Sequence, residues 1–169
     1  MLSKLFGGKS KANVLDIASP LSGSAVALSQ VPDAAFAEGH MGGGLAIEPS
    51  EGKLVAPFDG TVAHLIKTRH ALILEHATGV QVLMHIGINT VALKGEGFNA
   101  LIASGDTVKA GQTLIEFDME AIRAAGYPLI TPVVMANQEE AVAGLEVVKM
   151  GAVQAGDTGI LRVTVKPQT

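Results

Sequence analysis

Short apolar runs separated by turn residues dominate this chain from residue 14 onward. Each run is three to nine residues long and is bounded by Gly, Pro, Asp or Ser, a pattern typical of strands in an all-β sandwich or barrel. Aromatic residues make up only 4% of a chain that is 48% hydrophobic, so Val, Ile, Leu and Ala must fill most of the core. We therefore predict an all-β fold, with strands over residues 54–56, 62–66, 71–75, 80–88, 113–117 and 160–165.

Helix is expected only in short pieces, and the predicted domain organisation is simple. The candidate helices are residues 98–103, 119–125 and 139–142. With 169 residues, the chain is long enough for one domain with a sizeable core, which we place at residues 14–169. Residues 1–13 contain a Gly-Lys-Ser stretch that predicts a flexible segment. A weak amphipathic element that contacts a membrane or a partner is the alternative for this segment.

A faint repeat occurs within the predicted domain. The motif Pro-x-x-Gly-Ser/Thr begins at Pro20 and again at Pro57, and each copy leads into small or apolar residues. A turn that begins with proline and feeds a strand explains both copies. Two copies 37 residues apart indicate a duplicated β unit inside one domain, and they are too few for a solenoid.

The composition argues against several kinds of function. The net charge is −4 and no long Lys/Arg run occurs, which disfavours nucleic acid as a partner. The chain has no cysteine, so disulfides, thiolate zinc sites and cysteine nucleophiles are excluded. No stretch approaches the ~18–20 apolar residues that span a bilayer, so we expect no stable membrane insertion and a cytoplasmic location.

Residues 81–89 carry a histidine within a strand pattern. The even-numbered residues from Val82 to Ile88 form one apolar face that should point at the core, because alternate residues of a strand share a face. His85 lies on the opposite face, and so does Gly87. A glycine two residues away leaves room for a bulky group or a partner backbone. The pattern predicts an imidazole in an open position with an apolar rim.

A second histidine, His70, lies 15 residues before His85. Ala77-Thr78-Gly79 between them predicts a hairpin turn. With a turn centred near residue 78, residue 71 pairs with residue 85, which leaves His70 one position from the pair. Alternation leaves the direction of the His70 side chain open, because apolar residues lie on both faces of its strand.

Two neighbouring histidines suit phosphoryl transfer. An imidazole is largely neutral and nucleophilic near pH 7, so it can accept a phosphoryl group and release it again. The phosphoryl oxygens need hydrogen-bond donors, and candidates are His70, Thr68, Arg69 and the backbone N–H groups near Gly87. The alternative is that both residues are ordinary half-buried histidines.

A metal site is another alternative for the same two residues. Zinc takes four ligands, or three and a water, whereas His70 and His85 supply only two. No HExxH motif or spaced His/Asp cluster completes the set, so a resident catalytic zinc is not expected. A zinc shared with the carboxylate of a partner stays open.

A carrier of biotin or lipoate is a rival interpretation. Residues 105–116, with the sequence GDTVKAGQTLIE, resemble the hairpin of biotinyl and lipoyl carrier domains. Those domains present a lysine at a hairpin tip, and Lys149 before Met150 is the nearest trace of that motif here. We interpret the likeness as shared β-architecture without a shared cofactor.

Seven collinear segments resemble the glucose-type enzyme IIA of the bacterial sugar phosphotransferase system. They span about residues 14–165, nearly the whole chain, which makes the resemblance far more specific than any single motif. The segments are ASPLSG from Ala18, VPDAAFAE from Val31, GLAIEP from Gly44, VAPFDGT from Val55, HIGINTV from His85, LKGEGF from Leu93 and TPVV from Thr131.

The resemblance implies an antiparallel β-sandwich with Greek-key or jelly-roll features. It implies that His85 becomes a phosphohistidine through Nε2, and that His70 and Thr68 orient and stabilise the phosphoryl group. The donor would be the histidine-containing phosphocarrier protein, and the acceptor would be a cysteine of a sugar-specific enzyme IIB. The chain would be a phosphoryl-transfer intermediate in sugar uptake, not a free-standing sugar kinase, and would require no cofactor.

The resemblance also implies regulatory binding. The unphosphorylated form of such proteins binds permeases or metabolic enzymes, in some cases with a zinc bridged through His70 and His85. A pure binding module that has lost the phosphoryl relay is the alternative from a different functional class, and the presence of both histidines disfavours it. The predicted partner surface is the apolar rim of the site, formed by Val31, Phe36, Ile66, Leu72, Leu83, Ile86 and Ile88.

The chain departs from the pattern of this family at three positions. The family usually carries Asp where this chain has Asn89, often Asp where it has Gly43, and often Asn where it has Arg69. The lost negative charge at Asn89 would shift the choice of partner or the stability of the phosphoryl group. Arg69 either adds positive charge beside the phosphoryl group or is simply solvated. These departures bear on the regulatory partners more than on the phosphoryl relay.

Overall fold

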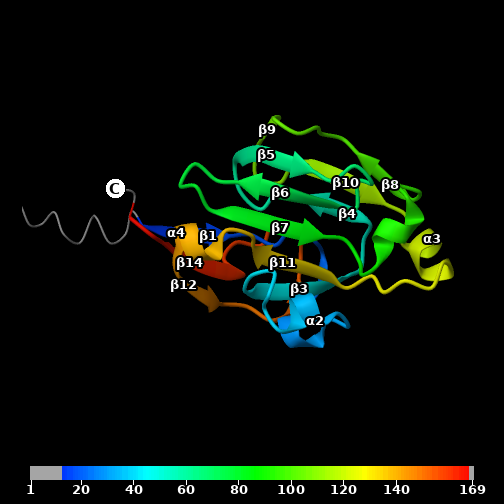
Figure 1. Ribbon diagram of the computed structural model, residues 1–169, viewed down its shortest axis with the longest axis horizontal. Coiled ribbons are helices and arrows are strands. Elements are labelled where there is room, and N and C mark those ends of the chain that lie inside the picture. The colour runs from blue at the N-terminus through cyan, green and yellow to red at the C-terminus, as the bar shows by residue number, and fades with distance from the viewer. Residues whose placement is uncertain (1–12, 168–169) are drawn as a thin grey trace, which may run out of the picture.

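The computed structural model describes residues 13–167, which form mainly antiparallel β-sheet (Figure 1). The N-terminal segment predicted at residues 1–13 therefore lies, apart from Asn13, outside the described residues. The largest sheet has eight strands in the order β13-β2-β3-β11-β7-β6-β5-β9. In that order the strands are Gly151–Val153, Gly23–Ala27, Gly44–Pro49, Thr131–Met135, Gln81–His85, Ala71–Glu75, Gly60–Leu65 and Thr107–Val108.

Two three-stranded sheets complete the fold and lie toward opposite ends of the molecule (Figure 1). Every strand pairing in the three sheets is antiparallel, so the predicted antiparallel β-sandwich is confirmed. One sheet has the order β4-β10-β8, with bounds Lys53–Val55, Thr113–Phe117 and Phe98–Ala100. The other has the order β1-β14-β12, with bounds Val14–Ile17, Leu161–Val165 and Val142–Val147.

The described helices are short, as the sequence predicts. Helix α3 begins after Asp118, whose side chain accepts a hydrogen bond from the Ala121 N–H and caps the first turn. No helix among residues 13–167 is long and apolar enough to cross a membrane. The helices are η1 at Leu28–Gln30, α2 at Ala34–Ala37, η2 at Thr90–Leu93, α3 at Met119–Ala124 and α4 at Gln138–Ala141.

The helix predicted at residues 98–103 is wrong. Its first half is strand β8, which pairs with β10 and places Phe98 opposite Phe117. Burial alternates along this segment, with Phe98 and Ile102 buried and the residues next to them exposed. Leu101 is an apolar residue on the exposed side, with half of its surface accessible, and it conceals the period of two in the sequence.

The two proline motifs occupy equivalent positions in the long sheet. Pro20 leads into β2, and Pro57 leads into β5. The strand order is symmetric about the central β11–β7 pair, because β3, β2 and β13 follow on one side as β6, β5 and β9 follow on the other. The faint repeat in the sequence corresponds to two equivalent halves of one sheet.

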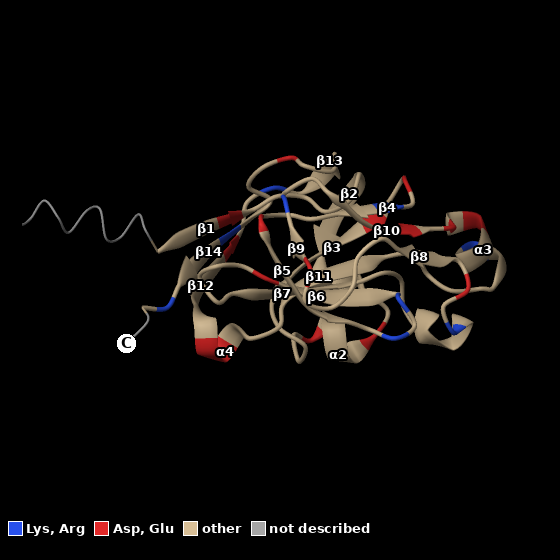
Figure 2. Ribbon diagram, turned by 90° about the horizontal axis from the view of Figure 1, so that it is seen from above, with Lys and Arg blue, Asp and Glu red and all other residues tan. Residues whose placement is uncertain are grey.

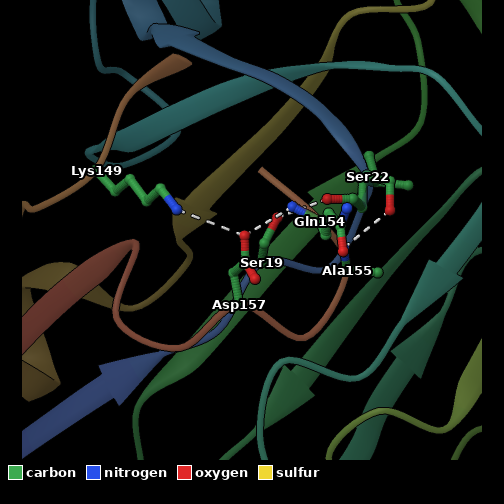
Figure 3. A network of polar contacts seen from close by, with 7 residues as sticks. Ser19, Ser22, Lys149, Gln154, Ala155 and Asp157 are labelled. Carbon is green, nitrogen blue, oxygen red and sulfur yellow. Dashed lines mark hydrogen bonds and ion pairs between the residues drawn. The ribbon is translucent and has the colours of Figure 1, made fainter. Parts of the chain in front are cut away.

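Equivalent side chains close the same turn in each half. Asp59 Oδ1 accepts a hydrogen bond from the Ala110 N–H at 2.8 Å, and Ser22 Oγ accepts one from the Ala155 N–H at 2.9 Å. Figure 3 shows the second of these turns, with Ser22 beside Ala155. Two backbone hydrogen bonds of 2.8 Å repeat in the same way, from Gly111 N–H to Ala56 O and from Gly156 N–H to Ser19 O.

Strand β7 divides its side chains between two apolar clusters. Val82 and Met84 are fully buried in the main core, whereas Leu83 lies in a second cluster on the other face of the sheet. His85 shares the Leu83 face and stacks against Phe36 of that cluster, with 5.2 Å between ring centroids. The prediction that His85 points away from the main core is confirmed. The second cluster consists of Val31, Phe36, Ala46, Ala71, Leu83, Ile88, Ile130 and Val134.

Candidate functional site

The β6–β7 hairpin brings His70 and His85 together. Ala71 pairs with His85, as the turn spacing predicts, and the Ile86 N–H donates to the His70 carbonyl oxygen at 2.7 Å. The two imidazole rings meet edge to face, with 4.8 Å between their centroids. The sequence left the direction of His70 open, and the structure turns this ring toward His85.

The backbone fixes which nitrogen of His85 carries the proton. Nδ1 lies 2.7 Å from the carbonyl oxygen of Gly87. A carbonyl oxygen can only accept, so Nδ1 must donate its hydrogen. In the neutral ring Nε2 then bears the free lone pair, which is the form that a nucleophile needs.

Thr68 holds the ring of His70. The Thr68 hydroxyl lies 2.7 Å from Nδ1 of His70, and His70 itself is only 4% exposed. Phe98 of β8 packs near the other side of the ring, with 6.2 Å between centroids. The side chains of Thr68 and His70 are therefore immobilised beside His85, in the places where the sequence predicts site residues.

Both imidazoles are neutral at pH 7. Burial, and then the charge that His85 would carry, lower the pKa of His70 from 6.5 to about 4. Burial also lowers the pKa of His85, while its hydrogen bond to Gly87 and the nearby carboxylate of Asp33 raise it in part. Two buried, neutral imidazoles each have a nitrogen lone pair, so the pair suits nucleophilic chemistry better than the binding of an anion through positive charge.

The lowered pKa of His70 predicts a loss of stability in acid. The unfolded chain binds a proton at His70 below about pH 6.5, whereas the folded chain resists protonation until about pH 4. The free energy of unfolding should therefore fall as the pH drops through this window, by about 2 kcal/mol from His70 between pH 7 and pH 5.

Urea unfolding of the native chain and of His70→Gln at both pH values measures this contribution. The variant should lose about 2 kcal/mol less between pH 7 and pH 5 than the native chain. Equal losses in the two proteins would contradict the assignment to His70.

The turn between β5 and β6 carries Thr68 and His70 and contains a strained residue. Arg69 has φ +62°, in the left-handed region, and its N–H donates to the carbonyl oxygen of Ile66 at 2.8 Å. Asparagine tolerates this conformation better than a long side chain does. Asparagine would therefore fit this turn better than Arg69 does.

Arg69→Asn is expected to stabilise the protein by about 0.5–1 kcal/mol and to raise Tm by about 1–4 °C, because it relieves the left-handed strain. Lys67→Asn is the matched control, since Lys67 lies in the same turn, carries the same charge and lacks a positive φ. Thermal unfolding of both variants gives the comparison. Equal Tm values would show that removal of charge, and not of strain, produces the change.

Gly87 has a different role from the one that the sequence predicts. Its φ is +72°, and a Cβ atom built on it would lie 2.7 Å from Pro128 O and from Thr90 Cγ2. The glycine is therefore required by the backbone and does not leave an open face. The same conformation ends β7 at His85 and stops the alternation, which places Ile88 in the second cluster and not in the main core.

The predicted partner surface is mostly buried, and only Ile66 among its seven residues is partly exposed. Leu72 pairs with Met84, and both Leu72 and Ile86 are 0% exposed in the main core, so neither can present a side chain to a partner. The remaining residues belong to the second cluster or pack against its edge, and those within it are no more than 8% exposed. They are Val31, Phe36, Ile66, Leu83 and Ile88.

Sequence reasoning missed two residues that act on the histidines. Phe98 contacts His70 but was assigned to a helix, and its alternation with Ile102 is the signal that would have placed it in a strand. Asp33 caps helix α2, because its side chain accepts a hydrogen bond from the Ala35 N–H. From this position its negative charge raises the pKa of His85. No spacing in the sequence links Asp33 to His85, because they lie on elements that meet only in the fold.

The alternative readings of the site find little support in the geometry. No three His, Asp or Glu side chains gather into a metal-binding group among residues 13–167, so a zinc at His70 and His85 would need ligands from another molecule. Lys149, the nearest trace of a lipoyl lysine, lies between β12 and β13, which belong to different sheets. It forms an ion pair with Asp157 at 3.6 Å (Figure 3) and does not sit at a hairpin tip.

Basic and acidic residues are interspersed along the ribbon in Figure 2, where the blue positions form no long continuous run. A basic stripe is the usual footprint of nucleic-acid binding. The arrangement agrees with the net charge of −4 and gives no support to nucleic-acid binding.

Comparison with known proteins gives consistent matches over most of the chain. Residues 15–141 match the family model of the phosphoenolpyruvate-dependent sugar phosphotransferase system, EIIA 1. The glucose-specific EIIA component of Bacillus cereus is 42% identical over 98% of this chain and 100% of its own length. The beta-glucoside-specific EIIBCA component of Dickeya chrysanthemi is 50% identical over 81% of this chain, which corresponds to 22% of that longer protein.

A solved structure matches the fold as well. The glucose permease IIA from Mycoplasma capricolum superimposes with a TM-score of 0.82 and 32% sequence identity. The match covers 88% of this chain and 95% of that one.

Proposed function

The chain belongs to the EIIA 1 family of the phosphoenolpyruvate-dependent sugar phosphotransferase system, and we propose that it carries a phosphoryl group on Nε2 of His85. It is a phosphoryl carrier of that system and works with a phosphocarrier and a sugar-specific EIIB component. The chain is thus a phosphoryl-transfer component of sugar uptake and not a free-standing sugar kinase.

The hydrogen bond from His85 Nδ1 to the Gly87 carbonyl is the observation that carries the proposal. It leaves the lone pair on Nε2, which attacks the phosphorus atom of the phosphorylated histidine on the phosphocarrier. A new N–P bond forms at Nε2 as the N–P bond of the donor breaks, and the electron pair returns to the donor imidazole. The lowered pKa of His85 keeps this lone pair available at pH 7.

We propose that His70 holds a phosphoryl oxygen and that Thr68 orients the His70 ring for this bond. If the Thr68 hydroxyl donates to Nδ1 of His70, the hydrogen of the neutral ring is on Nε2, the nitrogen farther from Thr68. That N–H then donates to a phosphoryl oxygen on His85, whose ring centroid is 4.8 Å away. The low pKa of His70 means that it does so as a neutral donor.

The partner interactions expected from the sequence belong to the same proposal. The phosphoryl group passes to a cysteine of the EIIB component, and docking uses Ile66, which is partly buried and packs against the second cluster. Regulatory binding of the unphosphorylated form, with a zinc shared between the two histidines and a partner, requires no resident cofactor. The cytoplasmic location expected from the sequence is part of the proposal.

The test is intact-mass measurement after incubation with enzyme I, the phosphocarrier protein and phosphoenolpyruvate. The chain should gain one phosphoryl group, about 80 Da, and lose it again in acid, as N–P bonds do. A chain that stays unmodified beside active partners would refute the relay and leave the binding-module alternative. A gain that survives acid would indicate a different acceptor residue.

A further inference from the structure

Two fully buried threonines surround the backbone that faces His85. Thr90 lies in η2 and Thr131 begins β11, and both are 0% exposed. A buried hydroxyl is unfavourable unless its hydrogen bonds are made. The bonds that these two hydroxyls make therefore show what they hold in place.

Both hydroxyls bind one and the same peptide group. Thr90 Oγ1 donates to the carbonyl oxygen of Ile86 at 2.6 Å, and Thr131 Oγ1 accepts from the N–H of Gly87 at 3.4 Å. That carbonyl and that N–H are the two edges of the peptide group that joins Ile86 to Gly87. The hydroxyl hydrogen of Thr131 goes to the carbonyl oxygen of Leu129 at 2.9 Å, so a lone pair is left for Gly87.

The next peptide group makes the contact with His85. The carbonyl oxygen of Gly87 accepts a hydrogen bond from Nδ1–H of His85 at 2.7 Å. The N–H of the same peptide group belongs to Ile88 and donates to the carbonyl oxygen of Pro128 at 3.1 Å. The two peptide groups are joined at the Cα atom of Gly87, which has φ +72°. Glycine has the widest choice of backbone conformations, so this carbonyl keeps its direction only if the groups around it are held.

We propose that Thr90 and Thr131 are positioning residues for phosphoryl transfer, because they clamp the Ile86–Gly87 peptide group and thereby hold the Gly87 carbonyl against Nδ1 of His85. The inference rests on the proposed role of His85. Thr90 makes the shorter bond and holds the peptide group more firmly than Thr131.

The clamp acts before and after phosphoryl transfer. Before transfer, it selects the ring form with hydrogen on Nδ1 and a lone pair on Nε2. After the N–P bond forms at Nε2, Nδ1 keeps its hydrogen and the ring carries positive charge, so the bond to the Gly87 carbonyl becomes charge-assisted. Loss of the clamp should slow acceptance and also shorten the lifetime of the phosphohistidine.

Thr90→Val and Thr90→Ser test the clamp. Thr90→Val keeps the branched shape without the hydroxyl, and it should lower the rate of phosphoryl acceptance about tenfold. In ¹⁵N NMR of the unphosphorylated protein above the pKa of His85, it should shift the His85 signals from the Nδ1–H form toward a mixture of both tautomers. Thr90→Ser keeps the hydroxyl and should restore both the rate and the tautomer.

Ser19→Ala is the matched control for lost stability. Ser19 is also 0% exposed, and its hydroxyl donates to the Leu21 carbonyl oxygen at 2.6 Å within the turn network of Figure 3. The variant loses an equally buried hydroxyl-to-carbonyl bond in a turn that does not carry the histidines. It should retain the native tautomer of His85 and the native rate.

The proposal is overturned if folded Thr90→Val keeps the Nδ1–H form and the native rate, or if Ser19→Ala changes both equally. If Thr90→Val does not fold, Thr131→Val and Thr131→Ser make the same comparison at the other edge of the peptide group, with the same expected and contradicting results. A failure of the proposed function is distinguishable, because the native chain would then take no phosphoryl group on His85. The tautomer signals would still decide whether the clamp exists.

Discussion

His85→Ala is expected to reduce phosphorylation to background. The substitution removes the imidazole whose Nδ1 donates to the Gly87 carbonyl oxygen. Among the described histidines, only this ring has a backbone carbonyl that holds its hydrogen on Nδ1 and leaves Nε2 free to attack. No neighbouring group can replace it, because Nδ1 of His70 is bound to Thr68 and the hydrogen of its neutral ring is then on Nε2. The measurement is the intact mass after incubation with phosphoenolpyruvate, enzyme I and the phosphocarrier protein.

His64→Ala is the control for this experiment. His64 lies on β5, is exposed, and belongs to neither the histidine pair nor the second cluster. It should take up the phosphoryl group as the native chain does. A His85→Ala protein that is folded by circular dichroism yet still gains about 80 Da would place the acceptor elsewhere.

His70→Ala is expected to separate acceptance from onward transfer. Acceptance begins with attack by a neutral imidazole, and the phosphocarrier brings its own groups to the phosphoryl oxygens. Onward transfer brings an anionic thiolate toward an anionic phosphoryl group, so a hydrogen-bond donor from this chain matters more. We expect acceptance within about tenfold of native and transfer slower by about 10²–10³-fold, the usual effect of losing one such donor.

Quenched-flow measurement of phosphoryl loss to a cognate EIIB component gives the rate of onward transfer. The fraction of the chain that becomes phosphorylated over time gives the rate of acceptance. Thr68→Val is the companion variant, because it leaves the His70 ring in place but removes the bond to Nδ1. It should slow transfer by a smaller factor than His70→Ala. Native transfer by His70→Ala would contradict the role assigned to this histidine.

The sequence predicts the pairing of the two histidine strands well because its signals are local. The pairing of residue 71 with His85 follows from hairpin length alone, and the structure has that register. The alternation around Met84 also predicts correctly that His85 points away from the main core. Local spacing is sufficient here because both histidines lie on one hairpin.

The errors arise where distant segments decide the conformation. Ile88 follows a glycine with φ +72°, which breaks the alternation and moves the side chain to the other cluster. Leu72 looks like part of a rim in the sequence, but its partner strand turns it into the main core. Leu101 is apolar and exposed, so it hides a strand that forms only against β10.

The threonine clamp was invisible to sequence reasoning for the same reason. Thr90 is close to Gly87 in sequence, yet its role depends on the direction of a carbonyl group. Thr131 lies 44 residues from Gly87 and reaches it only because β11 and β7 are neighbours. The register between strands decides which side chain reaches a given peptide group. This register cannot be predicted from composition or hydrophobic periodicity.

We propose above that Nε2 of His85 bears the phosphoryl group. The most direct measurement is one-bond ³¹P–¹⁵N coupling in the phosphorylated, ¹⁵N-labelled chain. We expect coupling to Nε2 of His85, with Nδ1 still protonated and bound to the Gly87 carbonyl oxygen. Coupling to Nδ1 of His85, or to either nitrogen of His70, would contradict it.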